Sequence, residues 1–189
     1  CSLLALEGYG MEAYKVASAD MTNNFLLEKL IRTNKPLIVS TGMSTQSEIA
    51  ETIKLLQENN ATYAMLHCNS TYPAPFAEIN LPYISTLKGM SKSIVGYSGH
   101  ERGIAVSIAA VAMGAKIIER HFTTDKDLEG NDHKVSLLPH EFASMVSGIR
   151  EVEQAINKTD YRVLSQGELM NRCLLYTSDA ADDLLCVDL

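Results

Sequence analysis

Two histidines, His100 and His121, each follow a short run of apolar or β-branched residues. These runs, 93–95 and 116–118, enclose a segment rich in Ala, Val and Ile at 103–115, and the pattern predicts a strand, a helix and a second strand. A right-handed crossover makes the two strands parallel neighbours about 5 Å apart, with both histidines at their carboxyl ends. Two imidazoles in that arrangement can share one metal ion.

The same unit of strand, polar loop and helix recurs along the chain before this region. Successive units with parallel strands form either a doubly wound sheet or a (β/α)8 barrel. A doubly wound sheet concentrates polar groups at one switch point, whereas polar residues follow every predicted strand here, which favours the barrel. No GxGxxG or P-loop motif supports a nucleotide-binding fold. The predicted strands are 13–16, 37–40, 62–66, 93–95 and 116–118, and the predicted helices are 23–33, 44–60, 81–90, 103–115 and 139–157.

The composition is that of a globular protein with an acidic surface. The chain has 189 residues, of which 46% are hydrophobic, and a net charge of −7. Because it has no cluster of Lys and Arg residues to neutralise phosphates, we expect no nucleic-acid partner. No apolar run reaches the roughly 18 residues of a membrane span, so we expect no membrane association. The cysteines show no CxxC spacing, which favours reduced thiols and a cytoplasmic location.

Six motifs along the chain, taken in order, resemble those of the N-acetylneuraminate synthase (sialic acid synthase) family. They are KVASADMTN, LIVSTGMS, HCNSTYPAP, VGYSGH, IIERHFTTDK and GNDHKVSL. The resemblance spans residues 13–172 and implies an α/β fold that is a partial (β/α)8 TIM barrel, approximately strands 4–8 with their helices. It also implies condensation of phosphoenolpyruvate with N-acetylmannosamine, with release of phosphate and with a divalent metal ion. Mn²⁺ is the expected ion, and Mg²⁺ and Co²⁺ are the alternatives.

The resemblance also assigns roles to individual residues. His100 and His121 become metal ligands and catalytic residues, and Asp20 joins them as a catalytic carboxylate at a position that is often Glu in the family. The shorter side chain of Asp20 is expected to alter which sugar is accepted. A phosphate and a carboxylate both need a cation and hydroxyl donors. The implied substrate-binding residues are Lys15, Ser18, Ser40, Ser70, Tyr72, Ser98 and Asp132, the last for the hydroxyl groups of the sugar.

Four residues beside these positions have roles that the motifs leave open. Gly99 replaces an Asp that is common in the family, and we expect the replacement to remove a polar side chain beside His100. Glu119 is either a carboxylate inside the barrel near the metal or a group that orients a histidine, and we favour the second role. His67 and Cys68 are interpreted as structural residues at the end of a strand.

We expect three parts in the chain. Residues 1–160 form the C-terminal part of a TIM-barrel synthase domain, and residues 161–172 form a linker towards an antifreeze-like domain. Residues 173–189 resemble translated sequencing-adapter read-through and are expected to be a non-native tail. The chain is therefore expected to be a fragment that lacks both ends. The family pattern implies a homodimer for the full-length protein, and an open sheet with two exposed edges predicts self-association of the fragment.

Three other functions remain open. A sibling nonulosonate synthase, for legionaminate or pseudaminate, shares the same motifs. A 3-deoxy-sugar-acid synthase prefers a phosphorylated aldose and needs additional basic residues, of which the loops offer few. A catalytically dead barrel that acts as a binding or scaffold protein would be expected to lose His100 or His121, and both are present.

Overall fold

The computed structural model describes residues 2–156 and 161–177. From β1 onward the first of these ranges alternates strand and helix, and each helix between two strands returns the chain to the start of the next strand. The strands are β1 (Tyr14–Val16), β2 (Leu37–Ser40), β3 (Tyr63–Cys68), β4 (Ile94–Gly99) and β5 (Ile118–Arg120). The helices are α1 (Ser2–Gly8), α2 (Asn24–Ile31), α3 (Gln46–Glu58), α4 (Tyr83–Ser91), α5 (Ala105–Ala112) and α6 (Pro139–Ala155), with short 3₁₀ turns η1 (Ser18–Asp20), η2 (Phe76–Glu78) and η3 (Asp132–Lys134).

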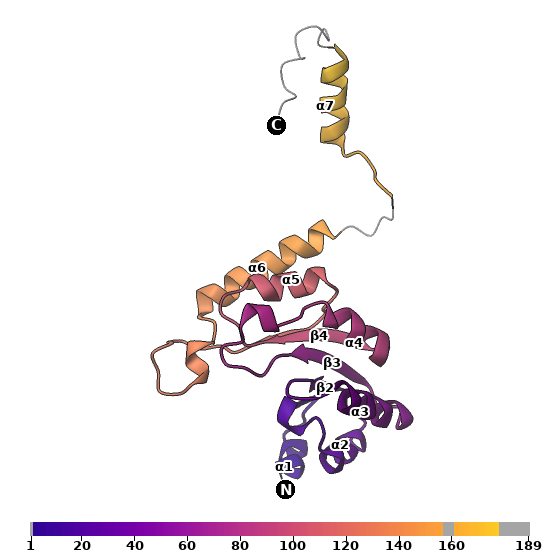
Figure 1. Ribbon diagram of the computed structural model, residues 1–189, viewed down its shortest axis with the longest axis vertical. Coiled ribbons are helices and arrows are strands. Elements are labelled where there is room, and N and C mark those ends of the chain that lie inside the picture. Colours follow the sequence, from indigo (N-terminus) through magenta and orange to yellow (C-terminus); the bar gives the residue numbers. More distant parts are fainter. Residues whose placement is uncertain (1, 157–160, 178–189) are drawn as a thin grey trace. The chain divides into compact units, whose positions relative to one another are not determined.

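Within the described residues, the strands form one parallel sheet in the order β1-β2-β3-β4-β5, which is also their order along the chain. A doubly wound sheet reverses its order at a switch point. This sheet does not, so the doubly wound alternative is wrong. Figure 1 shows the helices following one another around the sheet, with α5 packed against both β4 and α6. The predicted α/β fold, a partial barrel, is confirmed.

The two faces of the sheet carry different kinds of side chain, because successive residues of a strand point in opposite directions. One row across the sheet pairs Val16 with Val39, Val39 with Met65 and Met65 with Val95, and all four side chains are buried. These residues pack with buried side chains of the helices, including Leu27 of α2, Ile53 of α3 and Leu87 of α4. On the other face, near the carboxyl ends of the strands, lie Lys15, Ser40, Cys68, Ser98 and Glu119.

Local sequence signals account for where two of the helices begin. Before α3, the Thr45 side chain accepts a hydrogen bond from the backbone N–H of Glu48 (3.3 Å), and the Glu48 carboxylate accepts one from the N–H of Thr45 (2.7 Å). This reciprocal cap satisfies donors that the first turn of a helix leaves without partners. At α6, Pro139 begins the helix, and the Glu141 carboxylate accepts from the N–H of Leu138 (2.8 Å).

The boundaries of β3, β4 and β5 differ most from the predicted ones. β3 extends through Cys68, β4 extends through Gly99, and β5 begins at Ile118 rather than at residue 116. The prediction followed apolar runs alone, whereas polar residues such as His67, Ser98 and Arg120 continue these strands. As a result, His100 and His121 come directly after the last residues of β4 and β5.

The chain divides into two compact units, Cys1–Ile156 and Asn157–Leu189. The described part of the second unit contains α7 (Gln166–Thr177). The predicted linker at 161–172 therefore includes the first turns of a helix, and its relation to a further domain stays a prediction. The predicted non-native tail at 173–189 lies outside the described residues from position 178 onward. None of the described helices is both long and apolar enough to span a membrane.

Candidate active site

The carboxyl ends of the strands surround a cavity of about 280 Å³. Eight of the ten predicted site residues line it, and Asp20 and Asp132 do not. Each strand of the sheet contributes to its wall, either directly or through the loop that follows. The lining residues are Lys15, Ala17, Ser18, Ala19, Ser40, Met43, Cys68, Ser70, Tyr72, Ser98, His100, Glu119 and His121.

The imidazole rings of His100 and His121 lie side by side in this cavity, with centroids 5.2 Å apart and an interplanar angle of 62°. The Nδ1 atom of His100 lies 2.7 Å from the carbonyl oxygen of Asn69. A carbonyl oxygen can only accept, so Nδ1 carries a proton, and in the neutral ring Nε2 of His100 keeps a free lone pair. The ring of Tyr72 packs beside both histidines, with centroid distances of 4.1 Å to His100 and 5.8 Å to His121.

The two histidines titrate differently because their surroundings differ. Burial acts to lower the pKa of His100, but its contacts with the Cys68 thiol and the Asn69 carbonyl outweigh burial and raise it above the usual value. Burial, and then the neighbouring His100, lower the pKa of His121 below the usual value. His121 is therefore neutral at pH 7, which is the state that binds metal ions.

The donor set suits a divalent transition metal ion. Imidazole nitrogens bind such ions, and the Asn69 carbonyl holds the His100 ring in the tautomer that leaves Nε2 available. Among the described residues, no group of three or more His, Cys, Asp or Glu side chains is placed to hold an ion. His100 and His121 thus fit a half-site, in which the other coordination positions are left to water and substrate oxygens.

Glu119 lies inside the cavity between a serine and a lysine. Its Oε1 atom accepts a hydrogen bond from Ser98 Oγ (2.7 Å), and its Oε2 atom lies 3.4 Å from Lys15 Nζ. Neither contact involves a histidine, so the favoured interpretation of Glu119 as a group that orients a histidine is wrong, and it is an interior carboxylate. Among the residues that line the cavity, Lys15 is the only lysine or arginine.

Hydroxyl groups line the side of the cavity next to β2. Ser40 Oγ is buried and has no hydrogen-bond partner within the described part of the chain, so it is free to donate to a ligand. Ser18 Oγ accepts from the backbone N–H of Gly42 (3.0 Å). A Cβ atom at Gly42 would lie 2.8 Å from Ser18 Oγ and would collide with Ser70 Oγ. Gly42, which is absent from the predicted site residues, therefore lets the backbone approach both hydroxyls.

Cys68 also belongs to the site, although the sequence indicated only a structural role. Its Sγ atom lies 3.6 Å from Ser18 Oγ, 3.7 Å from Ser70 Oγ and 3.8 Å from His100 Nδ1. Burial raises the pKa of the Cys68 thiol, but the hydrogen bonds from His100 and Ser18 outweigh burial and lower it. The preceding residue, His67, points to the opposite face, where its Nε2 atom lies 2.6 Å from the Ile79 carbonyl oxygen.

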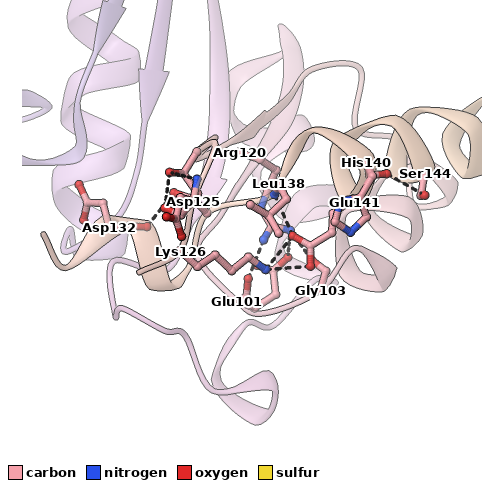
Figure 2. A network of polar contacts seen from close by, with 12 residues as sticks. Glu101, Gly103, Arg120, Asp125, Lys126, Asp132, Leu138, His140, Glu141 and Ser144 are labelled. Carbon is pink, nitrogen blue, oxygen red and sulfur yellow. Dashed lines mark hydrogen bonds and ion pairs between the residues drawn. The ribbon is translucent and has the colours of Figure 1, made fainter. Parts of the chain in front are cut away.

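The predicted sugar-binding residue, Asp132, lies next to the histidine pair without lining the cavity. Its Oδ2 atom is 3.9 Å from His121 Nδ1, and its backbone carbonyl accepts from Ser136 Oγ (2.7 Å). The loop that carries Asp132 is fastened to α6 by an ion pair of 2.7 Å between Lys126 and Glu141 (Figure 2). Asp20, at the end of η1, is half-buried and outside the lining residues, and its catalytic role stays a prediction.

Gly99 does not face the histidine pair, although the sequence predicted that a polar side chain is lost beside His100 at this position. A Cβ atom at this position would lie 2.7 Å from Glu101 Oε2, 2.8 Å from Tyr97 Cε1 and 3.0 Å from Arg120 Cδ. These three groups lie on the helix-covered face of the sheet, because Gly99 follows the inward-facing Ser98. The requirement for glycine therefore comes from packing behind the site.

Three comparisons place the chain among known proteins. The model of the NeuB family matches residues 1–161. The chain is 44% identical over 154 residues to the N,N'-diacetyllegionaminic acid synthase of Campylobacter jejuni, covering 80% of this chain and 46% of that protein. It is 41% identical over 153 residues to the human N-acetylneuraminate-9-phosphate synthase, covering 80% of this chain and 42% of that protein.

A solved structure resembles the chain over most of its length. It is the N-acetylneuraminic acid synthetase of Leptospira borgpetersenii in complex with citrate, with a TM-score of 0.82 and 32% sequence identity. The similarity covers 93% of this chain and 61% of that one. The chain thus spans less than half the length of the two curated relatives and somewhat more of the solved chain.

Proposed function

The chain belongs to the NeuB family, and from that premise we propose that the protein is a synthase that joins phosphoenolpyruvate to an acetamido sugar. The sugar would be N-acetylmannosamine or a relative of it, and the products would be N-acetylneuraminate, or a sibling nonulosonate, and phosphate. The observation that carries the proposal is the convergence of His100, His121, Lys15 and Glu119 on one cavity at the strand ends. This is the place where barrel enzymes carry out their chemistry.

We propose that phosphoenolpyruvate binds at the Lys15 side of the cavity. Its phosphate and carboxylate both require cationic and hydroxyl donors, which form stronger hydrogen bonds when one partner is charged. Lys15 supplies the ammonium group, and the hydroxyls of Ser18, Ser40 and Ser98 lie around the same cavity. The buried Ser40 hydroxyl supports this placement, because a donor without a partner in the described chain gains one when an anion binds.

We propose that His100 and His121 bind the divalent ion, with Mn²⁺ as the first candidate and Mg²⁺ and Co²⁺ as alternatives. Once bound, the ion would supply Lewis-acid polarisation of the aldehyde oxygen of the open-chain sugar. Tyr72, stacked beside His100, would keep bulk water from the two rings. Asp132 would accept hydrogen bonds from sugar hydroxyls next to His121. Asp20 remains a further candidate for a catalytic carboxylate.

In the proposed reaction, C3 of phosphoenolpyruvate forms a bond to the aldehyde carbon, water adds at C2, and phosphate leaves. No covalent intermediate with a protein nucleophile is required. The residues of this chain would act by holding the two substrates in contact and by stabilising charge as it develops. The full-length protein would act in the cytoplasm as a homodimer.

The identity of the sugar distinguishes the remaining candidates. Sibling synthases for legionaminate or pseudaminate would use the same cavity with a differently substituted sugar. A 3-deoxy-sugar-acid synthase is less well supported, because a phosphorylated aldose needs a second cationic subsite, and among the described residues that line the cavity Lys15 is the only lysine or arginine. A binding or scaffold role is disfavoured by the retention of both histidines in contact distance of each other.

The test is phosphate release from phosphoenolpyruvate by the full-length protein, with and without Mn²⁺, against a panel of acetamido sugars. The proposal expects release that depends on both the metal and one of the sugars. No release with any sugar in the presence of metal would count against the synthase. Release with an unsubstituted phosphorylated aldose alone would favour the 3-deoxy-sugar-acid class.

A further inference from the structure

A buried ion pair lies directly behind the histidine pair. The carboxylate of Glu101 and the guanidinium of Arg120 are 2.6 Å apart, and both side chains are fully excluded from solvent. Each residue adjoins a proposed metal ligand in the chain, since Glu101 follows His100 and Arg120 precedes His121. The ion pair therefore joins the end of β5 to the turn after β4 on the helix side of the sheet. The same two chain segments present His121 and His100 on the cavity side.

The ion pair is part of a larger network that fixes both segments. Arg120 Nη1 donates to Glu101 Oε1 (2.6 Å), to the Gly103 carbonyl (2.9 Å) and to Ser107 Oγ (3.0 Å), while Nη2 donates to the Glu101 carbonyl (2.6 Å). Tyr97 Oη donates to the other carboxylate oxygen of Glu101 at 2.7 Å. Figure 2 shows Arg120, Glu101 and Gly103 within this network. One guanidinium thus ties β5 to the turn that follows His100.

Stability alone does not explain such a pair. Two charges removed from water are costly, and apolar residues of similar volume often stabilise a fold at least as well. A network with directed hydrogen bonds does, however, hold its partners in one arrangement. Metal sites need that kind of support, because groups behind the ligands set the orientation of the ligands and affect metal affinity.

We propose that Glu101 and Arg120 are positioning residues that set the separation and orientation of the His100 and His121 rings for metal binding. This inference rests on the proposed function of the histidines as metal ligands. Gly99 belongs to the same device, because a Cβ atom there would lie 2.7 Å from Glu101 Oε2 and 3.0 Å from Arg120 Cδ. A side chain at position 99 would displace the ion pair.

The test replaces both charges together, so that no unpaired charge remains buried. The variant Glu101→Met/Arg120→Met is expected to keep its far-ultraviolet circular dichroism and to bind Co²⁺ about tenfold or more weakly, the loss typical for groups behind a metal ligand. The visible absorption of bound Co²⁺ should also change, because it reports the geometry of the ligands. Metal affinity by calorimetry and the Co²⁺ spectrum are both measured on the chain of 189 residues.

The matched control is the ion pair between Lys35 and Glu7, which lie 2.8 Å apart before the amino ends of the strands. Lys35→Met/Glu7→Gln removes a partly exposed pair of charges outside the cavity lining and is expected to leave Co²⁺ affinity and spectrum unchanged. If the Glu101→Met/Arg120→Met variant does not fold, Arg120→Lys decides the matter, because it keeps the buried charge but loses the forked donor.

The outcomes separate this inference from the proposed function. Unchanged Co²⁺ affinity and spectrum in the folded Glu101→Met/Arg120→Met variant, or in Arg120→Lys if that is the variant that folds, would overturn the inference while leaving the metal site intact. Absence of Co²⁺ binding by the unsubstituted chain would overturn the metal site and the inference with it. Weaker binding with an altered spectrum, while the Lys35 and Glu7 control is normal, supports the inference.

Discussion

The Nδ1 atom of His100 donates a hydrogen bond of 2.7 Å to the carbonyl oxygen of Asn69. Asn69 belongs to the loop after β3, and His100 follows the last residue of β4. The loop after one strand therefore selects the tautomer of a histidine at the end of the neighbouring strand. In the neutral ring the nitrogen left for a ligand is Nε2, and the ring centroids of His100 and His121 are 5.2 Å apart.

Replacing His121 by alanine should abolish measurable metal binding. The change removes one of two protein ligands, so the loss should exceed the 10- to 100-fold typical of residues behind a ligand. Calorimetric titration with Mn²⁺ or Co²⁺ measures it. His140→Ala, on the exposed start of α6, is the control and should bind metal normally. Normal binding by His121→Ala would remove His121 from the ligand pair.

Replacing Lys15 by methionine should weaken binding of phosphoenolpyruvate. Met keeps most of the length of the side chain but removes the ammonium that faces Glu119 at 3.4 Å, and a hydrogen bond to a charged group contributes about 1.5–3 kcal/mol. The KM of the full-length enzyme for phosphoenolpyruvate should rise about 10-fold or more. Lys29→Met is the control, because Lys29 stacks on Phe25 at the surface of α2. A KM that does not change in Lys15→Met would place the anion elsewhere.

Replacing Glu141 by glutamine should make the chain less stable at pH 7 but not in acid. Hydrogen bonds from Lys126 and from the N–H of Leu138 lower the pKa of Glu141 below its ordinary 4.5. The unfolded chain therefore binds this proton more readily, and the stabilisation is present above about pH 4.5 and lost as the pH falls through the folded-state pKa. The expected loss at pH 7 is about 0.5 kcal/mol, as for other partly exposed ion pairs.

Urea unfolding of this variant at pH 7 and at pH 3 provides the measurement. Glu51→Gln is the control, because Glu51 is exposed on α3 and its side chain makes no hydrogen bond or ion pair within the described part of the chain. An equal loss for Glu141→Gln at both pH values would contradict the electrostatic origin of the effect.

Replacing Gly99 by alanine should destabilise the chain by about 1–3 kcal/mol, as overpacking of a filled interior does. The added methyl group would press on Tyr97, Glu101 and Arg120, all at 3.0 Å or less from the new atom. Gly89→Ala is the matched control: Gly89 lies in α4 with nothing within 4 Å, and alanine there should be neutral or stabilising. Similar unfolding free energies for the two variants would show that the space behind His100 is not tightly packed.

Much of the candidate site could be predicted from the sequence, because each apolar run that forms a strand is followed by a polar loop and a helix, and the start of the loop marks the end of the strand. His100 and His121 come directly after neighbouring strands, as that pattern predicts. The end of β3 was harder to see, since His67 and Cys68 are polar or small and end the apolar run, yet they pair in register with Tyr97 and Ser98 of β4. The carboxyl end of β3 is set by its pairing with β4, and that pairing cannot be read from a single sequence.

The buried Glu101 and Arg120 could not be predicted in the same way. Charged residues next to functional histidines are expected to be exposed to solvent at the rim of the site. The sequence also does not show that Glu101 pairs with Arg120, which lies 19 positions further along the chain. The sequence placed the effect of Gly99 on the cavity face, beside His100, whereas a side chain at this position would face the helices. The sequence alone does not show to which face of the sheet a residue at the end of a strand points. Only the register of Gly99 opposite Arg120 resolves the question.

The alternation of the strands has a consequence for how the protein can vary. Met65 and His67 face the helices, whereas Cys68, the last residue of β3, faces the cavity. A substitution at Cys68 can therefore change what the cavity accepts while the helix-facing row of Val39, Met65 and Val95 keeps its contacts. Deleting one residue between Met65 and Cys68 would move helix-facing side chains to the cavity face and cavity-facing side chains to the helix face. New specificities should therefore arise through point substitutions in the strands, and changes of length should be confined to the loops.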